Sequence, residues 1–119
     1  MTFEVKDLGK PDETRTFEHG ELGLVELPGV TVGRTVLHPG WRWSNDVKPI
    51  VQTGSCQQAH TMYVLSGTLH IAMDDGQEGE IGAGQTGVLS PGHDAWVVGD
   101  EDFIAIDWSG AATYATPPE

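Results

Sequence analysis

The chain has 119 residues, of which 38% are hydrophobic and 20% charged, a composition typical of one globular domain rather than of a disordered segment. Its formal net charge of −12 repels phosphate backbones and anionic lipid headgroups, which argues against nucleic acids and membrane surfaces as partners. The single cysteine, Cys56, excludes an internal disulfide, and the N-terminus lacks a signal-peptide pattern, so we expect a cytoplasmic protein.

Short runs rich in β-branched and aromatic residues, separated by turn residues, predict strands along the chain. In residues 1–29 the pattern is weaker, and residues 3–8 and 22–27 are predicted as flanking strands or as an arm that pairs with a second subunit. The more regular strands follow, at residues 30–37, 62–65, 68–73, 77–81, 87–89, 95–98 and 103–108.

Turn residues between these runs predict an all-β fold. Asp75-Gly76 tolerates the positive φ of a tight turn and predicts a hairpin. Strands at this spacing predict a sandwich or a closed barrel, with the barrel core at about residues 34–108 of a single domain spanning 1–119. Residues 44–58 form a long polar connection, and a lid or binding residues are expected in such a loop beside a barrel mouth.

Two stretches resemble the two motifs of the cupin superfamily. Residues 59–69, A-H-T-M-Y-V-L-S-G-T-L, resemble the first motif, in which a strand ends in Tyr-Val-Leu-x-Gly. Residues 80–85, followed by 88–93, resemble the second motif, with a Gly-rich turn, a short strand and a Pro-Gly corner. The resemblance implies a double-stranded β-helix (jelly-roll) barrel, and it leaves function open, because cupins include enzymes of several classes and binding modules.

The metal-binding pattern of the superfamily is altered in this chain. Cupins typically carry His-x-His, then Glu, then a third His after the Pro-Gly corner. The family positions can be counted back from Gly67, the glycine of the Tyr-Val-Leu-x-Gly segment. The positions of the two His and of the Glu are then occupied by Gly54, Cys56 and His60, respectively. The third His position is Ala95, and His93 stands two residues before it, about 6.6 Å along a strand.

Cys56, His60 and His93 therefore remain as candidate metal ligands at the barrel mouth. One Cys and two His suit Zn²⁺ or another divalent metal (Fe, Mn or Ni), with one position left for water or substrate. A subset of the three with Asp94 or Gln58 is an alternative ligand set.

Each of these residues also has a structural interpretation. Cys56 can be interpreted as a small buried apolar side chain. His60 and His93 can each be interpreted as a buried polar residue whose ring hydrogen-bonds to a neighbouring carbonyl or carboxylate. As a nucleophile and base, Cys56 and His60 would lie about 13 Å apart on a regular strand, so that interpretation requires a bend.

Tryptophans provide a second candidate feature. Trp41 and Trp43 alternate, so both indoles would share one face if this segment is a strand, and Trp96 lies near the second motif. They are interpreted either as core and interface residues or as a pocket wall that binds a planar or sugar-like ligand.

We predict a small cupin barrel, as a homodimer, that binds a metal ion, a small ligand or both in its mouth. The alternatives are a metal-dependent enzyme of dioxygenase, isomerase or lyase type, and a structural or regulatory protein with no small-molecule site. Catalytic residues are not assigned by the sequence.

Overall fold

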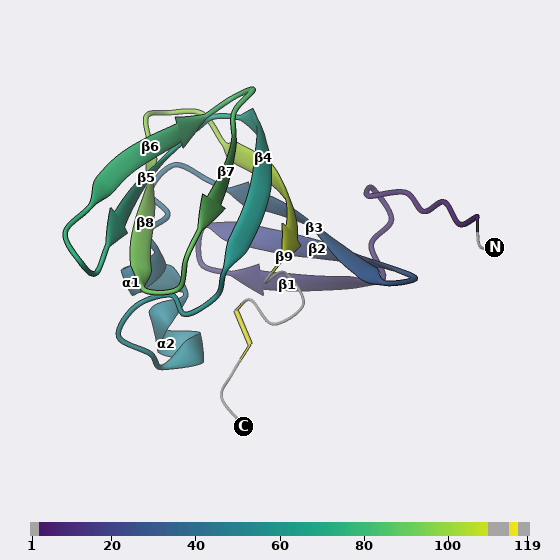
Figure 1. The fold of residues 1–119 in the computed structure, drawn as a ribbon, viewed down its shortest axis with the longest axis horizontal. Coiled ribbons are helices and arrows are strands. Elements are labelled where there is room, and N and C mark those ends of the chain that lie inside the picture. Colours follow the sequence, from purple (N-terminus) through teal and green to yellow (C-terminus); the bar gives the residue numbers. More distant parts are fainter. Residues whose placement is uncertain (1–2, 110–114, 117–119) are drawn as a thin grey trace.

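Two antiparallel sheets face each other and form a barrel in the computed structural model, which describes residues 3–109 and 115–116 (Figure 1). The larger sheet has the strand order β1-β2-β3-β9-β4-β7 and the smaller one β6-β5-β8. The strands are β1 (Glu13–Phe17), β2 (Gly20–Leu27), β3 (Val30–Leu37), β4 (His60–Ser66), β5 (Thr68–Met73), β6 (Glu78–Gly82), β7 (Thr86–Leu89), β8 (His93–Val98) and β9 (Phe103–Ser109).

Alternation of side chains along the strands builds the core. In β4, His60, Met62 and Val64 are buried, while the residues between them are exposed. In β9, Phe103, Ala105 and Asp107 are likewise the buried residues, and β9 lies between β3 and β4. The period of two therefore directs one set of side chains from each strand into the barrel and the other set outward.

The all-β prediction is confirmed, and the N-terminal part differs from it in detail. Residues 3–8 form no strand, and β1 comes later, where Glu13–Phe17 pairs with β2. The segment ETRTF is mostly polar because β1 is an edge strand with little burial, so its hydrophobic pattern is too weak to reveal it.

The predicted loop 44–58 contains two four-residue helices, α1 (Trp43–Asp46) and α2 (Lys48–Val51). Helices of four residues complete barely one turn and show no helical periodicity in a sequence. A polar contact fixes the first, because Arg42 N donates to Asp46 Oδ2 at 2.9 Å.

None of the helices in the described residues is long and apolar enough to cross a membrane.

The turn between β4 and β5 illustrates how closely the chain packs. Gly67 has a φ of +79°, and a Cβ there would lie 2.5 Å from the backbone oxygen of Asp102. Only glycine combines this backbone conformation with this close approach. The glycine of the Tyr-Val-Leu-x-Gly segment thus lets β4 and β5 turn against the start of β9.

Candidate metal centre

Cys56 is held at the barrel mouth by the backbone of the β8 strand. Its N–H donates to the carbonyl oxygen of His93 at 2.7 Å, and its own carbonyl oxygen accepts from Gly92 N at 2.7 Å and from His93 N at 3.3 Å. These bonds make an isolated antiparallel bridge between Cys56 and His93. The thiol is therefore positioned by the Pro-Gly corner that precedes β8.

His60 is the first residue of β4 and points into the barrel. Its Nδ1 lies 2.6 Å from Oδ2 of Asp107, which is itself buried on the neighbouring strand β9. Its Nε2 lies 3.7 Å from Sγ of Cys56. Because the carboxylate can only accept, Nδ1 carries a proton, and Nε2 is the ring nitrogen that faces the sulfur.

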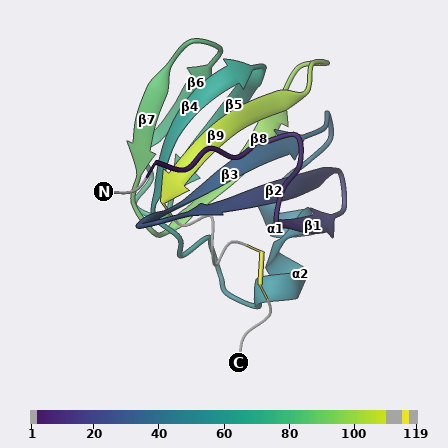
Figure 2. The ribbon, with the colours of Figure 1, turned by 90° about the vertical axis from the view of Figure 1, so that its right-hand side faces the viewer.

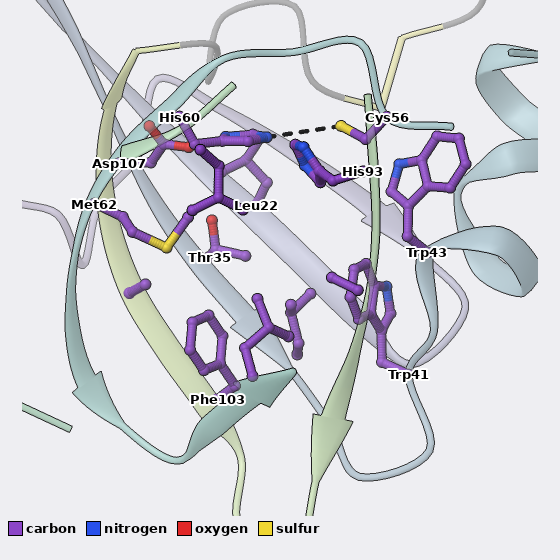
Figure 3. A pocket seen from close by; sticks show the side chains of 15 residues that line it. Leu22, Thr35, Trp41, Trp43, Cys56, His60, Met62, His93, Phe103 and Asp107 are labelled. Atoms are coloured by element: carbon purple, nitrogen blue, oxygen red, sulfur yellow. Dashed lines mark hydrogen bonds and ion pairs between the residues drawn. The ribbon is translucent and has the colours of Figure 1, made fainter. Parts of the chain in front are cut away.

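His93 is the first residue of β8 and is oriented in the same way. Its Nδ1 lies 2.8 Å from the carbonyl oxygen of Ser90, so Nδ1 donates and Nε2 is the ring nitrogen left for another partner. The rings of His60 and His93 meet edge to face, with centroids 5.4 Å apart. Figure 3 shows both rings directed toward Cys56.

The three side chains have the spacing of a metal site. One ligand atom from each of Cys56, His60 and His93 lies within 4.8 Å of the others, and all three residues are buried. In a tetrahedral zinc site, bonds of about 2.3 Å to sulfur and 2.0–2.1 Å to nitrogen place S and N about 3.6 Å apart. The observed Sγ–Nε2 separation of 3.7 Å is close to that value.

The same contacts determine the charges at the centre. Burial raises the pKa of the Cys56 thiol, but hydrogen bonds from His60 and His93 outweigh burial and lower this pKa to about 6. Burial lowers the pKa of His60, but its bonds to Asp107 and Cys56 raise it to about 9. Without a metal, the site at neutral pH therefore contains a thiolate beside an imidazolium.

An apolar cavity adjoins the three residues. It has a volume of about 40 Å³, more than the roughly 10–15 Å³ that one buried water requires. Besides the three candidate ligands it is lined by Leu22, Thr35, Leu37, Trp41, Trp43, Met62, Leu69, Leu89, Ala95, Phe103, Ala105 and Asp107. Next to the centre there is therefore room for a few water molecules or a ligand of similar size.

Two of the three predicted wall tryptophans line this cavity. Trp41 and Trp43 are each 2% exposed and border it, although Trp43 begins α1 and does not lie on a strand (Figure 3). Trp96 lies on the outward face of β8 and is absent from the cavity lining. Its indole stacks on His70, with centroids 4.5 Å apart, and the Arg42 guanidinium lies 4.4 Å from its ring.

The other predicted ligand positions lie outside the centre. Asp94 Oδ1 accepts from Ser44 N at 3.1 Å and from Ala95 N at 2.9 Å, so this carboxylate serves the α1 backbone. Gly54 is exposed, and Ala95 lines the cavity without a ligand atom.

Two features of the centre differ from the sequence-based picture. Cys56 and His60 are close because residues 52–59 bend instead of forming a regular strand. Asp107 was not predicted as a site residue, although a signal for it exists. Asp107 alternates with Phe103 and Ala105 along β9, so its side chain points into the barrel. A buried carboxylate needs a hydrogen-bond partner inside the barrel.

Comparisons of structure find the same barrel in solved proteins. No known family model matches the sequence, and no curated protein matches it significantly. The cupin domain of Cnp3 from Schizosaccharomyces pombe is similar with a TM-score of 0.58 and 12% identity, over 85% of this chain and 69% of that one. An RmlC-like cupin from Shewanella frigidimarina is similar with a TM-score of 0.52 and 15% identity, over 78% of each chain. The chain has the cupin fold.

Other cupin-like barrels show that this fold does not determine the activity. The polyketide cyclase RemF from Streptomyces resistomycificus is similar with a TM-score of 0.63 and 13% identity, over 92% of this chain and 80% of that one. At such identities the similarity concerns the fold alone. The function of this chain must therefore be inferred from its own site.

Proposed function

We propose that this cupin binds one divalent metal ion through Cys56 Sγ, His60 Nε2 and His93 Nε2. The observation that carries the proposal is that one ligand atom from each of the three residues lies within 4.8 Å of the others, while each histidine Nδ1 is bonded to an acceptor. Metal-binding histidines commonly donate their other ring N–H to a carboxylate or a carbonyl, which fixes the tautomer and raises ligand basicity. Asp107 and the Ser90 carbonyl supply these acceptors.

Zinc is the metal that fits the donor set best. One thiolate with two imidazoles suits Zn²⁺ and other borderline ions such as Ni²⁺ or Fe²⁺, whereas Mn²⁺ prefers oxygen ligands. A reduced thiol ligand is stable in a reducing compartment, which supports the cytoplasm as the proposed location.

Elemental analysis of tag-free protein tests the metal proposal. After loading with Zn²⁺ and removal of the excess, we expect about one zinc per wild-type chain. We expect Cys56→Ser and His93→Ala to lose most of it while retaining the β-rich circular dichroism of the wild type.

A matched control is His70→Ala, because His70 lies outside the cavity and its ring nitrogens contact Glu78 and Glu80. This variant should bind zinc like the wild type. If wild-type protein stays free of zinc, or if Cys56→Ser keeps a full equivalent, the proposed centre is wrong.

A metal-dependent enzyme is the second candidate function. Only three protein ligands converge in the described residues, and the adjoining cavity has room for a water or a small substrate. Three protein ligands plus an open position are typical of catalytic zinc, while structural zinc has four. Trp41 and Trp43 would form the wall against which a small ligand packs.

The open position can be tested with cobalt in place of zinc. Azide added to the Co²⁺-loaded protein should change the visible cobalt spectrum if a coordination position is exchangeable. An unchanged spectrum at saturating azide would indicate a closed structural site and would argue against catalysis at this centre.

A further inference from the structure

The strands β6 and β7 border an open cleft on one side of the barrel. They follow each other through a short turn, but they are edge strands of different sheets. Figure 1 shows them diverging from that turn, and Figure 2 shows β7 as the left-hand edge of the six-stranded sheet. The cleft has a volume of about 600 Å³ and is lined by residues 77–81 and 85–90, with Ile71 and Met73 of β5. Binding sites typically have volumes of roughly 300–1,000 Å³.

The β6 edge presents backbone groups to this cleft. Met73 N donates to the carbonyl oxygen of Gln77 at 2.8 Å, so these two opposite residues form a hydrogen-bonded pair. Bonded and non-bonded pairs alternate along an antiparallel ladder, so the peptide groups of Glu78 and Glu80 point away from β5. No strand of the described residues pairs with β6 on that side.

The β7 edge is open in the same way and carries no charged side chain. Val64 N donates to the carbonyl oxygen of Gln85 at 2.9 Å, and the register of β7 on β4 continues without a shift. By the same alternation, the peptide groups of Thr86 and Val88 point away from β4 and toward the cleft. An open strand edge is a template for a further strand, and β7 offers one without charge repulsion.

The floor of the cleft is apolar and has a hollow. Ile71, Ile81 and Leu89 line it with their inward side chains. Gly79 is opposite Ile71, so it occupies an inward position on β6, and nothing lies within 4 Å of a Cβ built there. The space beside Gly79 can therefore take an apolar side chain from a bound molecule.

Two carboxylates form the outer rim of the cleft on β6. The side chains of Glu78 and Glu80 are 57% and 52% exposed, and they contact His70 Nε2 at 2.8 Å and His70 Nδ1 at 3.3 Å. One imidazole carries at most one positive charge, so the rim stays negative when both carboxylates are ionised. The described residues that line the cleft include no Lys or Arg. The rim is therefore complementary to a cationic side chain.

We propose that this cleft binds an extended segment of another protein, in which apolar and basic residues alternate. The segment pairs with the β7 edge, as in other cases of strand addition to an open sheet. Successive side chains of a strand point to opposite faces, so the apolar ones enter the hollow at Gly79 and the basic ones face Glu78 and Glu80.

The sequence of this chain favours a different protein as the occupant. Its six basic residues are Lys6, Lys10, Arg15, Arg34, Arg42 and Lys48, and no two of them are two positions apart. A second copy therefore offers no segment with basic residues at alternate positions. Its net charge of −12 would also repel the acidic rim.

Binding of a synthetic peptide to the full-length chain tests the proposal. The probe is a fluorescent eight-residue peptide of alternating valine and lysine, blocked at both ends and followed by anisotropy. We expect saturable binding of one peptide per chain. A peptide of alternating valine and glutamate should not bind, because the rim repels it. Spermidine, a cation without a peptide backbone, should displace the probe poorly.

A charge-matched pair of variants tests the rim. Glu78→Gln with Glu80→Gln should raise the Kd of the valine–lysine peptide about tenfold, because two ion pairs are lost. Asp100→Asn with Glu101→Gln changes the net charge equally, at exposed positions between β8 and β9. This control should bind the peptide like the wild type.

A glycine pair tests the hollow. Gly79→Val places its side chain in open space, so the variant should keep the thermal stability of the wild type while losing peptide binding. Gly54→Val is the matched control, because nothing lies within 4 Å of a Cβ there either and Gly54 does not line the cleft. It should bind the peptide like the wild type.

Amide hydrogen exchange measured by nuclear magnetic resonance tests the backbone pairing. Saturation with the valine–lysine peptide should slow exchange of the Thr86 and Val88 N–H groups. Four results would each overturn the proposal: no saturable binding by the wild type, full binding by Gly79→Val, equal weakening in the two charge-matched variants, or bound peptide without slower exchange on β7. Since the cleft variants leave Cys56, His60 and His93 unchanged, their zinc content reports on the metal centre independently.

Discussion

At the scale of single residues, Cys56 and His60 form a thiolate–imidazolium pair in the metal-free protein. The pKa of Cys56 is lowered to about 6 and that of His60 is raised to about 9. In an unfolded chain the corresponding pKa values are about 8.5 and 6.5. The folded protein therefore moves one proton from sulfur to imidazole without changing the number of protons bound near neutral pH.

This exchange has an unusual consequence for stability. The thiolate contribution appears as the pH rises through the folded pKa of Cys56, about 6, and grows up to its unfolded pKa. The imidazolium contribution is complete below the unfolded pKa of His60 and is lost as the pH rises to about 9. Between about pH 6.5 and 8.5 the two slopes have opposite signs, so the pair adds almost no pH dependence to the free energy of unfolding.

We therefore predict that ultraviolet spectroscopy detects the thiolate–imidazolium pair, whereas the pH dependence of the free energy of unfolding does not. In metal-free wild-type protein, the ultraviolet absorbance of the thiolate should rise with a midpoint near pH 6. In His60→Gln the neutral amide supplies no positive charge and only His93 still opposes the effect of burial, so the midpoint should rise well above pH 6.

The control for this titration is His38→Gln. His38 contacts Asp102 at 2.9 Å and is absent from the cavity lining, so its loss should leave the midpoint near pH 6. A wild-type midpoint at or above the value of a free thiol would show that His60 does not hold the proton.

At the scale of elements, the turn between β4 and β5 packs directly against the start of β9. Gly67 and Gly29 both have positive φ, at +79° and +80°. A Cβ at Gly67 would meet the backbone of residues 102 and 103 at 2.5–2.9 Å, whereas nothing lies within 4 Å of a Cβ at Gly29. An alanine at position 29 therefore introduces backbone strain alone, whereas an alanine at position 67 introduces backbone strain and steric overlap.

We predict that Gly67→Ala is clearly more destabilising than Gly29→Ala. Gly29→Ala should cost about 1–2 kcal/mol, the cost of a left-handed conformation for an L-residue. Gly67→Ala adds overpacking against backbone atoms, for which about 1–3 kcal/mol more is typical. Urea unfolding followed by tryptophan fluorescence measures both values. Equal losses would show that the β4–β5 turn relaxes and that the close approach is not a constraint.

The elements also show how much of this molecule can be predicted from its sequence. Strands such as β5 and β9 are predictable because alternation and flanking turn residues are local properties. Polar β1 and the four-residue helices lack a local period, so they are not predictable in this way. The Cys56–His60 contact depends on the bend at residues 52–59 and on the bridge to β8, which are tertiary features.

The residues of the candidate centre were partly predictable for the same reason. Cys56, His60 and His93 stand out by residue type and by their place in two motifs. Asp107 does not, because its role depends on β9 lying next to β4, and strand order is not visible in a single sequence. Trp96 was predicted in the pocket wall, but it occupies an outward position in the alternation along β8, so its indole points away from the cavity.

At the scale of the whole molecule, the candidate ligands connect the two sheets. His60 belongs to β4 of the six-stranded sheet, and His93 belongs to β8 of the three-stranded sheet. Cys56 lies between them on the connection that follows α2. A metal ion held by all three would therefore link two sheets that otherwise meet through apolar packing and connecting loops.

We predict that Zn²⁺ stabilises the wild-type protein against thermal unfolding through this link. A ligand that binds only the folded state adds about 2.7 kcal/mol when its free concentration is 100 times Kd. The melting temperature should therefore rise with free zinc in differential scanning calorimetry and return to the metal-free value after addition of a chelator.

The comparison with Cys56→Ser makes this prediction specific to the centre. Serine nearly conserves volume but removes the thiolate and its contribution to metal-free stability. Measured from the variant's own metal-free melting temperature, the zinc-induced rise should largely disappear. A rise of equal size in Cys56→Ser would place zinc on other groups, such as the many exposed carboxylates. Zinc would then stabilise the chain by lowering its net negative charge, and the two sheets would not be linked through the mouth of the barrel.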